Sequence, residues 1–402
     1  MSTGVAAQTR VPRVVAVLAL SIFVLGTSEF MITGLLPEMA RDLAVSIPAT
    51  GYLISAFAIG MIVGAPLMAI VTLALPRRTT LVASLLVFVV GHVLAALASD
   101  YGVVLVARVV TALATATFWV VAAVVAVSMA SEHLRARALA VLLSGLTVAT
   151  VLGVPLGTVV GQQLGWRATF WAVAGLALLG LVGVLATVPR RTEGTRRPVL
   201  RDELAAFRRR RLWLALGTTA LYQAGALSVV AYVAPLLTAV AGVPESWVPA
   251  VLFGYGLAAL AGITVGGRLA DAHPWATLFT ALGAGAVIFA VLGLFAAVPG
   301  VAVVSIVLLG GVAFLVAAPL NARVFQLAGA APTLASAANT AAFNVGNTLG
   351  PVLGGLVISA GHGYASPSWI ALALLLGSIG LGVAGRAADR TASQNPDRTS
   401  AG

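Results

Sequence analysis

Glu29 is the residue whose type and position first suggest chemistry. It is one of twelve acidic residues, and the other eleven fall in predicted loops, tails or helix ends. Glu29 alone stands well inside an apolar stretch. An ionised, unpaired carboxylate costs several kcal/mol in hydrocarbon, so its presence requires a reason. Burial makes a carboxyl bind protons near neutral pH, and we therefore expect a proton site. The alternative is a structural residue that is protonated or hydrogen-bonded.

Arg108 is the only arginine well inside a predicted membrane helix. Counting inward at the helical rise places Glu29 about 12 Å from Pro37 and Arg108 about 9 Å from Gly102. The two residues are thus expected at similar depth on different helices. We hypothesise that the charge of Arg108 opposes the effect of burial on Glu29. The alternative is that Arg108 extends to the outer interface.

Polar and aromatic residues at spacings of three and four predict the faces of a substrate cavity. A small amphipathic ligand is bound by aromatic rings with a few hydrogen-bonding groups. For any single residue, a hydrogen bond between helices is an equal alternative. The candidates are Thr33, Thr111, Thr115, Trp119, Tyr222, Gln223, Phe343 and Asn344.

The chain that positions these residues is built for a membrane. It has 402 residues, of which 60% are hydrophobic and 9% charged, whereas a soluble domain carries about 25% charged residues. Its apolar runs are near the roughly 20 residues that span a bilayer as a helix. We predict an all-α membrane protein of twelve transmembrane helices in two pseudo-symmetric six-helix bundles. The expected helices are 14–36, 49–72, 79–98, 102–127, 138–161, 168–188, 212–238, 247–270, 276–296, 300–322, 334–360 and 368–386.

The arginines predict the orientation. With the N-terminus inside, 20 of the 23 basic residues fall in cytoplasmic segments and 2 in external ones, which favours cytoplasmic termini in the plasma membrane of a bacterium. The basic segments are therefore topology signals that can touch anionic lipid, and no nucleic-acid partner is expected. The expected parts are an N-terminal bundle (1–188), a basic linker (189–211), a C-terminal bundle (212–388) and a disordered tail (389–402).

The two halves resemble a parallel repeat at an offset of 198 residues. Ala74, Pro76 and Thr79 match Ala272, Pro274 and Thr277 at that offset. Small residues at every fourth position let helices approach closely. We interpret these stripes as the interface between the halves, with packing inside one half as the alternative. The key positions are Gly153, Pro155, Gly157, Gly350, Pro351 and Gly354.

Other chemistry has little support in the sequence. Cysteine is absent, so no disulfide or thiol chemistry is possible, and the four histidines have no metal-ligand spacing. No set of nucleophile, base and acid appears, so we expect neither an enzyme nor a metal site. The proton is the expected coupling ion, no cofactor is expected, and the protein is expected to be a monomer.

Along its whole length the chain resembles the major facilitator superfamily, and within it the drug:proton antiporter branch. The motifs are GTSEFMITGLLPE (26–38), ARVV (107–110), GVPLG (153–157) and GRLAD (267–271). The resemblance implies a gating role for Arg77, Arg78 and Asp271 at the cytoplasmic side. One departure is Leu73, where the family has an aspartate.

The resemblance is greatest to actinobacterial chloramphenicol exporters. It implies proton-coupled efflux of a small drug by alternating access, with chloramphenicol or related phenicols as substrates. One acid facing one arginine leaves the cavity near neutral, which suits a neutral substrate. The alternatives are an exporter of broader range and an importer or facilitator of a small solute such as a sugar.

Overall fold

The computed structural model describes all residues except 1–11, 73–74, 132–133, 190–208, 329–331 and 395–402. The described part contains helices and no strand. Twelve of its helical segments are long and apolar enough to cross a membrane. The predicted class and the number of spans are therefore confirmed, and the predicted linker lies almost entirely outside the described residues.

The first six spans are formed by eight α-helices and two short irregular turns. Pro37 and Pro155 occupy the first turns of α2 and α7, where a missing N–H has no cost. The elements are α1 (Arg13–Phe30), the 3₁₀ turn η1 (Met31–Gly34), α2 (Leu36–Asp42), α3 (Ile47–Val71), α4 (Arg77–Leu97), α5 (Tyr101–Met129), α6 (Arg135–Val148), the π turn η4 (Ala149–Gly153), α7 (Val154–Leu164) and α8 (Trp166–Thr187).

The last six spans follow a similar plan. The elements are α10 (Arg210–Val230), α11 (Val233–Pro235), the π turn η6 (Leu236–Val240), the 3₁₀ turn η7 (Glu245–Trp247), α12 (Val248–Ala272), α13 (Pro274–Phe295), α14 (Pro299–Ala328), α15 (Pro332–Val357), the π turn η8 (Ile358–His362) and α16 (Pro367–Gln394).

The opening helix of each half is interrupted at matching places. In the first half α1 stops at Phe30 and α2 resumes at Leu36. In the second half α10 stops at Val230 and α11 resumes at Val233. These breaks fall close to the offset of 198 residues that relates Pro37 to Pro235. The repeat seen in the sequence thus has a structural counterpart.

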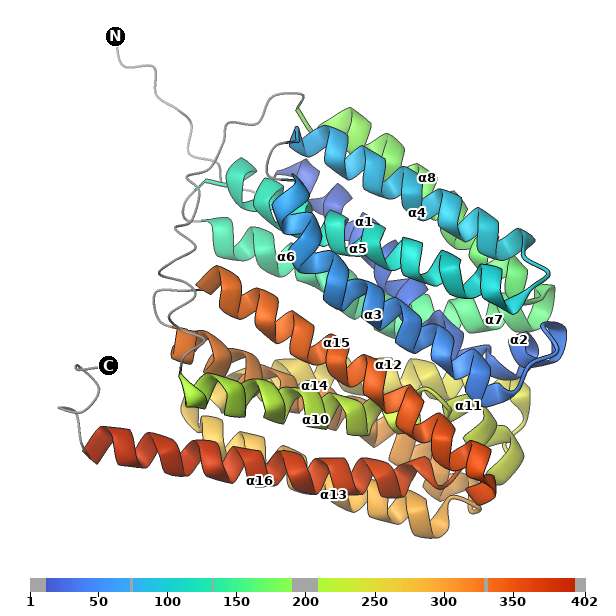
Figure 1. The fold of residues 1–402 in the computed structure, drawn as a ribbon, viewed down its shortest axis with the longest axis vertical. Coiled ribbons are helices and arrows are strands. Elements are labelled where there is room, and N and C mark those ends of the chain that lie inside the picture. The colour runs from blue at the N-terminus through green and yellow to red at the C-terminus, as the bar shows by residue number, and fades with distance from the viewer. Residues whose placement is uncertain (1–11, 73–74, 132–133, 190–208, 329–331, 395–402) are drawn as a thin grey trace.

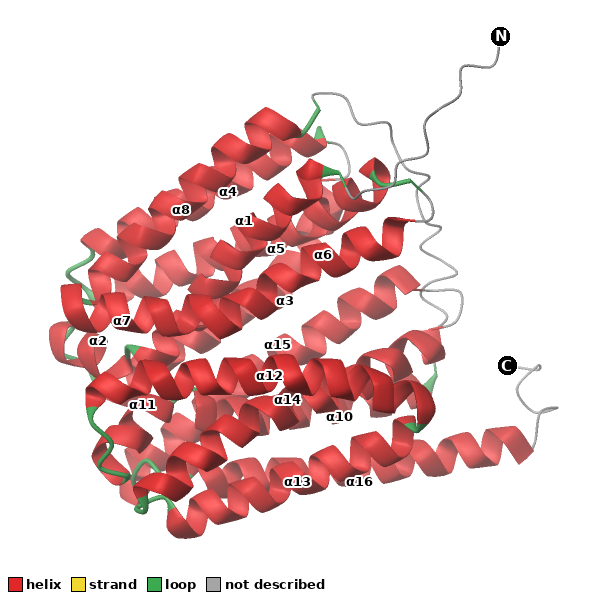
Figure 2. Cartoon of the chain, turned by 180° about the vertical axis from the view of Figure 1, so that it is seen from behind, coloured by secondary structure: helices red, strands yellow, loops and turns green. Residues whose placement is uncertain are grey.

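The helices form two groups that lie side by side (Figures 1 and 2). In one group α1 packs on α6 and α8, and α4 packs on α5 and α8. In the other α10 packs on α15 and α16, and α13 packs on α14 and α16. The groups meet where α3 lies along α15 and where α12 lies against α7 and η4.

Both groups have apolar residues on the outside. Leu20, Leu97, Leu164, Leu179 and Leu294 are each more than 60% exposed. In water this would be unfavourable, but in lipid it matches the solvent. The chain is a multi-pass membrane protein.

The start of α1 and the end of α16 lie at the same end of the bundle (Figure 1). We call this the terminal end and the opposite one, which carries α2 and α11, the far end. Near the far end Ser55 donates a hydrogen bond to the Thr348 carbonyl oxygen (2.9 Å), and Gln162 donates one to the Glu245 carbonyl oxygen (3.0 Å). Each bond links one half to the other, so the halves are joined at the far end.

The interpretation that the glycine stripes lie between the halves is wrong. A Cβ on Gly153 would overlap Thr27 of α1, and one on Gly157 would touch Thr169 and Met31, all in the first half. Likewise a Cβ on Gly350 or Gly354 would meet α10, within the second half. These stripes bring neighbouring helices of one bundle together. The period of four predicts a close helix contact but not the identity of the partner.

Two other glycines do lie at the contact between the halves. A Cβ on Gly256 of α12 would lie 2.5 Å from Val151 Cα in η4. A Cβ on Gly51 of α3 would overlap the phenol ring of Tyr232, which follows α10. Tyr232 is fully buried in the core cluster of the first half and donates a hydrogen bond to the Pro351 carbonyl oxygen (2.7 Å).

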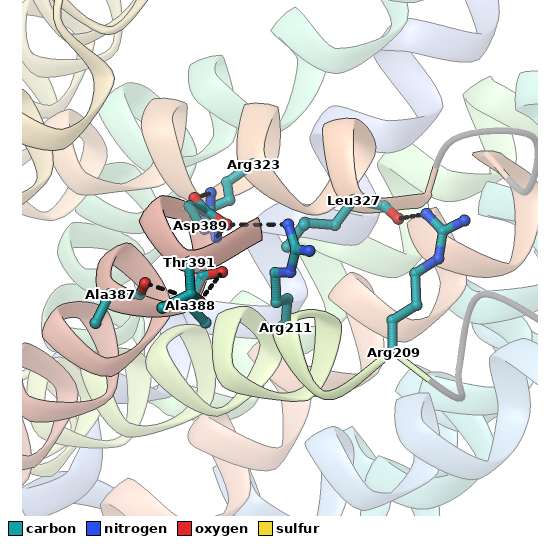
Figure 3. A network of polar contacts seen from close by, with 8 residues as sticks. All are labelled: Arg209, Arg211, Arg323, Leu327, Ala387, Ala388, Asp389 and Thr391. Atoms are coloured by element: carbon teal, nitrogen blue, oxygen red, sulfur yellow. Dashed lines mark hydrogen bonds and ion pairs between the residues drawn. The ribbon is translucent and has the colours of Figure 1, made fainter. Parts of the chain in front are cut away.

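The predicted tail at 389–402 is too long, because α16 continues to Gln394. Figure 3 shows the reason. Asp389 pairs with Arg323 of α14 (2.7 Å) and with Arg211 of α10 (3.6 Å). These ion pairs fix the last turns of α16 against two neighbouring helices. Residues 395–402 lie outside the described part.

Candidate functional site

Arg108 lies in the interior of the first bundle, on α5. Its side chain is 1% exposed, so the alternative of a side chain reaching the outer interface is wrong. Nη1 donates to the Ser28 carbonyl oxygen (2.9 Å) and Nη2 to the Glu29 carbonyl oxygen (3.1 Å). Nε lies 3.4 Å from the Leu53 carbonyl oxygen, and the guanidinium lies 4.3 Å from the centre of the Phe57 ring. One arginine therefore links α5 to α1 and α3.

The break in α1 explains why an arginine is placed here. The last carbonyl groups of an α-helix have no partner within the helix, and they carry the negative end of the helix dipole. Ser28 and Glu29 stand just before the end of α1 at Phe30. Arg108 supplies both the missing donors and a positive charge. In a membrane no water would otherwise satisfy these carbonyl groups.

Glu29 is half-buried and lies next to this arginine in the chain fold, as the depth argument predicted. The guanidinium nevertheless contacts its main chain and not its side chain. No ion pair within 4.0 Å joins Arg108 to the Glu29 carboxylate, and the three ion pairs found in the described residues lie elsewhere. The carboxylate is thus left available for a proton or a ligand.

Three groups around Arg108 were not predicted from the sequence. Ser28 Oγ accepts a hydrogen bond from Arg108 Nη1 (3.2 Å) and lies 2.7 Å from His92 Nε2 of α4. Phe57 provides the aromatic face. In the sequence, His92 is one of four histidines without metal-ligand spacing. The signal that could have found it is its place in an apolar run, because a titratable residue inside a membrane helix is a functional candidate.

The predicted cavity residues of the first half are mostly engaged within their own helices. The hydroxyls of Thr33, Thr111 and Thr115 donate to the carbonyl oxygens of Phe30, Arg108 and Thr111. All three side chains are at most 2% exposed. Trp119 is half-buried and packs on the Phe57 cluster between α3 and α5. These three hydroxyls bond to carbonyl groups three or four residues back in the chain, whereas the alternative interpretation was a hydrogen bond between helices.

The predicted cavity residues of the second half lie on α10 (Tyr222 and Gln223) and on α15 (Phe343 and Asn344). Gln223 donates a hydrogen bond to Asn347 Oδ1 (2.7 Å). The hydroxyl of Tyr222 and Oδ1 of Asn344 are buried without a hydrogen-bond partner. Phe343 on α15 is half-buried. Buried polar atoms without a partner are costly, so a hydrogen-bonding ligand would gain most at the Tyr222 hydroxyl and at Asn344 Oδ1.

The predicted gating residues belong to both bundles, at the start of α4 and near the end of α12. Arg78 donates to the Leu185 carbonyl oxygen (2.6 Å), which ties α4 to α8, and Arg77 begins α4. Asp271 is exposed at the end of α12 and borders a cavity of about 200 Å³ that Trp275 and Arg323 also line. It forms no ion pair within the described part. Leu73 lies outside the described residues.

A cluster of charged and polar side chains links three elements at the far end of the first bundle. Asp42 of α2 accepts hydrogen bonds from Arg167 and from Trp166 Nε1 (2.9 Å), and Arg167 also donates to the Ala98 carbonyl oxygen (2.7 Å). The hydrogen bond from Arg167, followed by that from Trp166, holds the pKa of the Asp42 carboxyl below its usual value. This cluster joins α2, α8 and the turn after α4.

Replacing Asp42 with Asn is expected to lower the melting temperature slightly at pH 7. A carboxyl whose pKa is lowered by folding stabilises the fold above its unfolded pKa, and this contribution disappears as the pH falls through the folded value. The difference from wild type should therefore shrink below about pH 3.9. Thermal unfolding in detergent at several pH values measures it, with Glu245→Gln, an exposed acid at the same end, as control. A difference that stays constant down to pH 3 would refute the ionic origin.

The chain is similar to known transporters over nearly its full length. The sequence model of the Major Facilitator Superfamily matches residues 18–342. The chloramphenicol resistance protein of Streptomyces lividans is 41% identical over 367 residues, covering 89% of this chain and 94% of that protein. The inner membrane transport protein YdhP of Escherichia coli K12 is 39% identical over 348 residues, covering 87% and 89%.

Solved structures agree on the fold. The bacterial homologue of the human lysosomal transporter Spinster, in its inward-facing occupied form, superposes with a TM-score of 0.74 at 17% identity, covering 94% of this chain and 97% of that one. The family match and the two relatives decide the assignment. The chain belongs to the major facilitator superfamily and is a membrane transporter, not an enzyme.

Proposed function

We propose that this transporter exports a small neutral drug, chloramphenicol or a related phenicol, in exchange for protons across the plasma membrane of a bacterium. The observation that carries the substrate class is the 41% identity to a chloramphenicol resistance protein. The motifs around Glu29 and Arg108 support antiport. The arginine distribution favours an orientation with both termini in the cytoplasm.

Glu29 carries the proton in this proposal. Glu29 is half-buried, and its carboxylate has no ion-pair partner in the described residues. The carbonyl oxygen of the same residue accepts a hydrogen bond from Arg108. A protonated Glu29 is neutral and can remain in the apolar interior, whereas an ionised one favours access to water or to ligand. Proton loading and release thus couple to which side of the membrane the site faces.

The drug occupies the space between the halves. On the second-half side the unpaired Tyr222 hydroxyl and Asn344 Oδ1 offer one donor and one acceptor. A phenicol carries hydroxyl, amide and nitro groups together with an aromatic ring, so it can use both. Arg77, Arg78 and Asp271 lie at the terminal end, where they gate the cytoplasmic side. As the halves rock, the far-end contacts described above break and form again.

Exchange of a neutral drug for a proton moves net charge. The membrane potential then contributes about 2.3 kcal/mol per 100 mV for each charge, in addition to the pH gradient. Membrane lipid surrounds the apolar exterior, and the expected assembly is a monomer. An exporter of broader range and a facilitator of a small solute are the rival functions.

Competition for transport separates these functions. Inverted membrane vesicles containing the protein are energised, and uptake of labelled chloramphenicol is measured with excess unlabelled phenicol, ethidium or sugar. We expect competition by phenicols only. Competition by ethidium with none by phenicols would overturn the substrate class, and uptake that needs no proton gradient would favour a facilitator.

A further inference from the structure

His92 is a buried polar group that the proposed transport cycle does not use. It lies on α4 and is 1% exposed, between the rings of Phe88 (4.1 Å between centroids) and Phe170 (5.6 Å). Its Nδ1 lies 2.9 Å from the Phe88 carbonyl oxygen and its Nε2 lies 2.7 Å from Ser28 Oγ. Both ring nitrogens are therefore hydrogen-bonded.

The partners fix the position of the imidazole proton. A carbonyl oxygen can only accept, so Nδ1 carries the hydrogen. A second positive charge next to the buried guanidinium of Arg108 would be repelled. The ring is therefore neutral, and Nε2 accepts the hydroxyl hydrogen of Ser28. The Ser28 oxygen then turns a lone pair toward Arg108 Nη1, at 3.2 Å.

Ser28 differs in this respect from the other hydroxyl residues of α1. Ser21 donates to the Val17 carbonyl oxygen (3.0 Å) and Thr27 to the Phe23 carbonyl oxygen (2.8 Å), four residues back in each case. This is the usual bond of a serine or threonine inside a helix. Ser28 gives up that bond for the imidazole. His92 thus determines where the Ser28 hydroxyl points.

We propose that His92 is a positioning residue for Arg108, which it holds through Ser28 on the carbonyl groups at the end of α1. The proposal rests on the proposed role of Glu29 as proton carrier. With His92 in place, the guanidinium binds the main chain of Ser28 and Glu29 and leaves the Glu29 carboxylate free to take a proton. Without His92, the Ser28 hydroxyl donates to a carbonyl oxygen of α1, and the Arg108 guanidinium can pair with the Glu29 carboxylate.

The charged and titratable groups around His92 are few in the described part. Glu29 comes from α1 and Arg108 from α5, while α8 presents the ring of Phe170 and α4 the ring of Phe88. A change in the pH dependence of transport therefore reports on Glu29 and Arg108. An ordinary packing role for His92 would lower stability without moving that dependence.

The test compares His92→Leu and Ser28→Ala with His92→Gln, whose amide oxygen can still accept from Ser28. Chloramphenicol-driven proton movement is measured in proteoliposomes as a function of pH. We expect both disruptive variants to shift the half-maximal pH downward by about one unit, a tenfold loss of proton affinity, and His92→Gln to restore the wild-type profile. His362→Leu, at an exposed histidine, should leave it unchanged.

A second measurement does not depend on transport. The infrared band of the protonated Glu29 carboxyl, assigned with Glu29→Gln, is titrated in each variant. A wild-type midpoint in His92→Leu, or a shifted one in His92→Gln, would overturn the positioning role. If wild type shows no chloramphenicol-driven proton movement, the proposed function fails, and the infrared titration still decides the role of His92.

Discussion

Replacing Arg108 with alanine is expected to abolish export and to destabilise the first bundle by about 3 kcal/mol. The variant leaves the carbonyl oxygens of Ser28, Glu29 and Leu53 without the donors they have at 2.9, 3.1 and 3.4 Å. Each buried group left unsatisfied costs about 1–3 kcal/mol. The positive charge at the end of α1 is lost as well. Thermal unfolding and drug uptake in vesicles measure the two effects.

Arg108→Lys separates charge from geometry. Lysine keeps the positive charge, but its three N–H groups leave a single nitrogen and do not reproduce the planar spread of a guanidinium across carbonyl oxygens of two helices. Loss of one charged hydrogen bond corresponds to about a tenfold or larger change in rate or equilibrium. We therefore expect Arg108→Lys to insert normally and to transport at least about tenfold more slowly. Wild-type transport by the lysine variant would show that charge alone suffices. An infrared titration of Glu29 in Arg108→Ala with the wild-type midpoint would show that Arg108 does not act on Glu29.

Replacing Gly51 with alanine is expected to prevent the far end from closing. The added methyl group would overlap the phenol of Tyr232, whose Cζ would lie 2.7 Å away. Tyr232 cannot retreat easily, because it is fully buried and its hydroxyl binds the Pro351 carbonyl oxygen. Overpacking of this kind costs about 1–3 kcal/mol. Alternating access needs both states, so transport should fall about tenfold, the change that 1.4 kcal/mol produces.

The controls for Gly51→Ala come from the same fold. Gly175→Ala and Gly283→Ala add the same methyl group where nothing lies within 4 Å, and both should transport normally. Combining Gly51→Ala with Tyr232→Ala removes the overlap and should recover part of the activity, because the two sites are in contact.

Disulfide crosslinking measures directly whether the two halves are in contact at the far end. The chain has no cysteine of its own that would interfere. Gln162→Cys with Glu245→Cys places a thiol pair where a hydrogen bond now crosses between the halves. The yield of the crosslink should fall when Gly51→Ala is added. An unchanged yield with reduced transport would mean that Gly51 acts elsewhere.

Hydropathy was sufficient to predict the spans, because each apolar run has only one way to satisfy its backbone in lipid. The resemblance and the depth argument also placed Glu29 near Arg108. What they could not give is the direction of the guanidinium. The guanidinium points to the main chain because α1 ends at Phe30. The sequence has no proline or glycine at that residue to predict the break.

The remaining differences have a common origin in tertiary contacts. A stripe such as Gly153 and Gly157 is the same in sequence whether its partner is α1 or the other bundle. His92 counts as one polar residue in an apolar run until Ser28 is placed 2.7 Å from it. In the sequence Asp389 belongs to a polar C-terminal stretch, and only the fold shows its ion pairs with Arg323 and Arg211.

Chloramphenicol accumulation in a sensitive bacterial host tests proton-coupled export by Glu29 most directly. It is measured for wild type with and without an uncoupler, for Glu29→Gln, and for Glu245→Gln, an exposed acid at the first residue of its span, at the far end of the bundle. We predict that wild type and Glu245→Gln keep the drug out, and that both the uncoupler and Glu29→Gln restore accumulation to the level of cells without the transporter. Exclusion that survives the uncoupler and the loss of the Glu29 carboxyl would contradict the account.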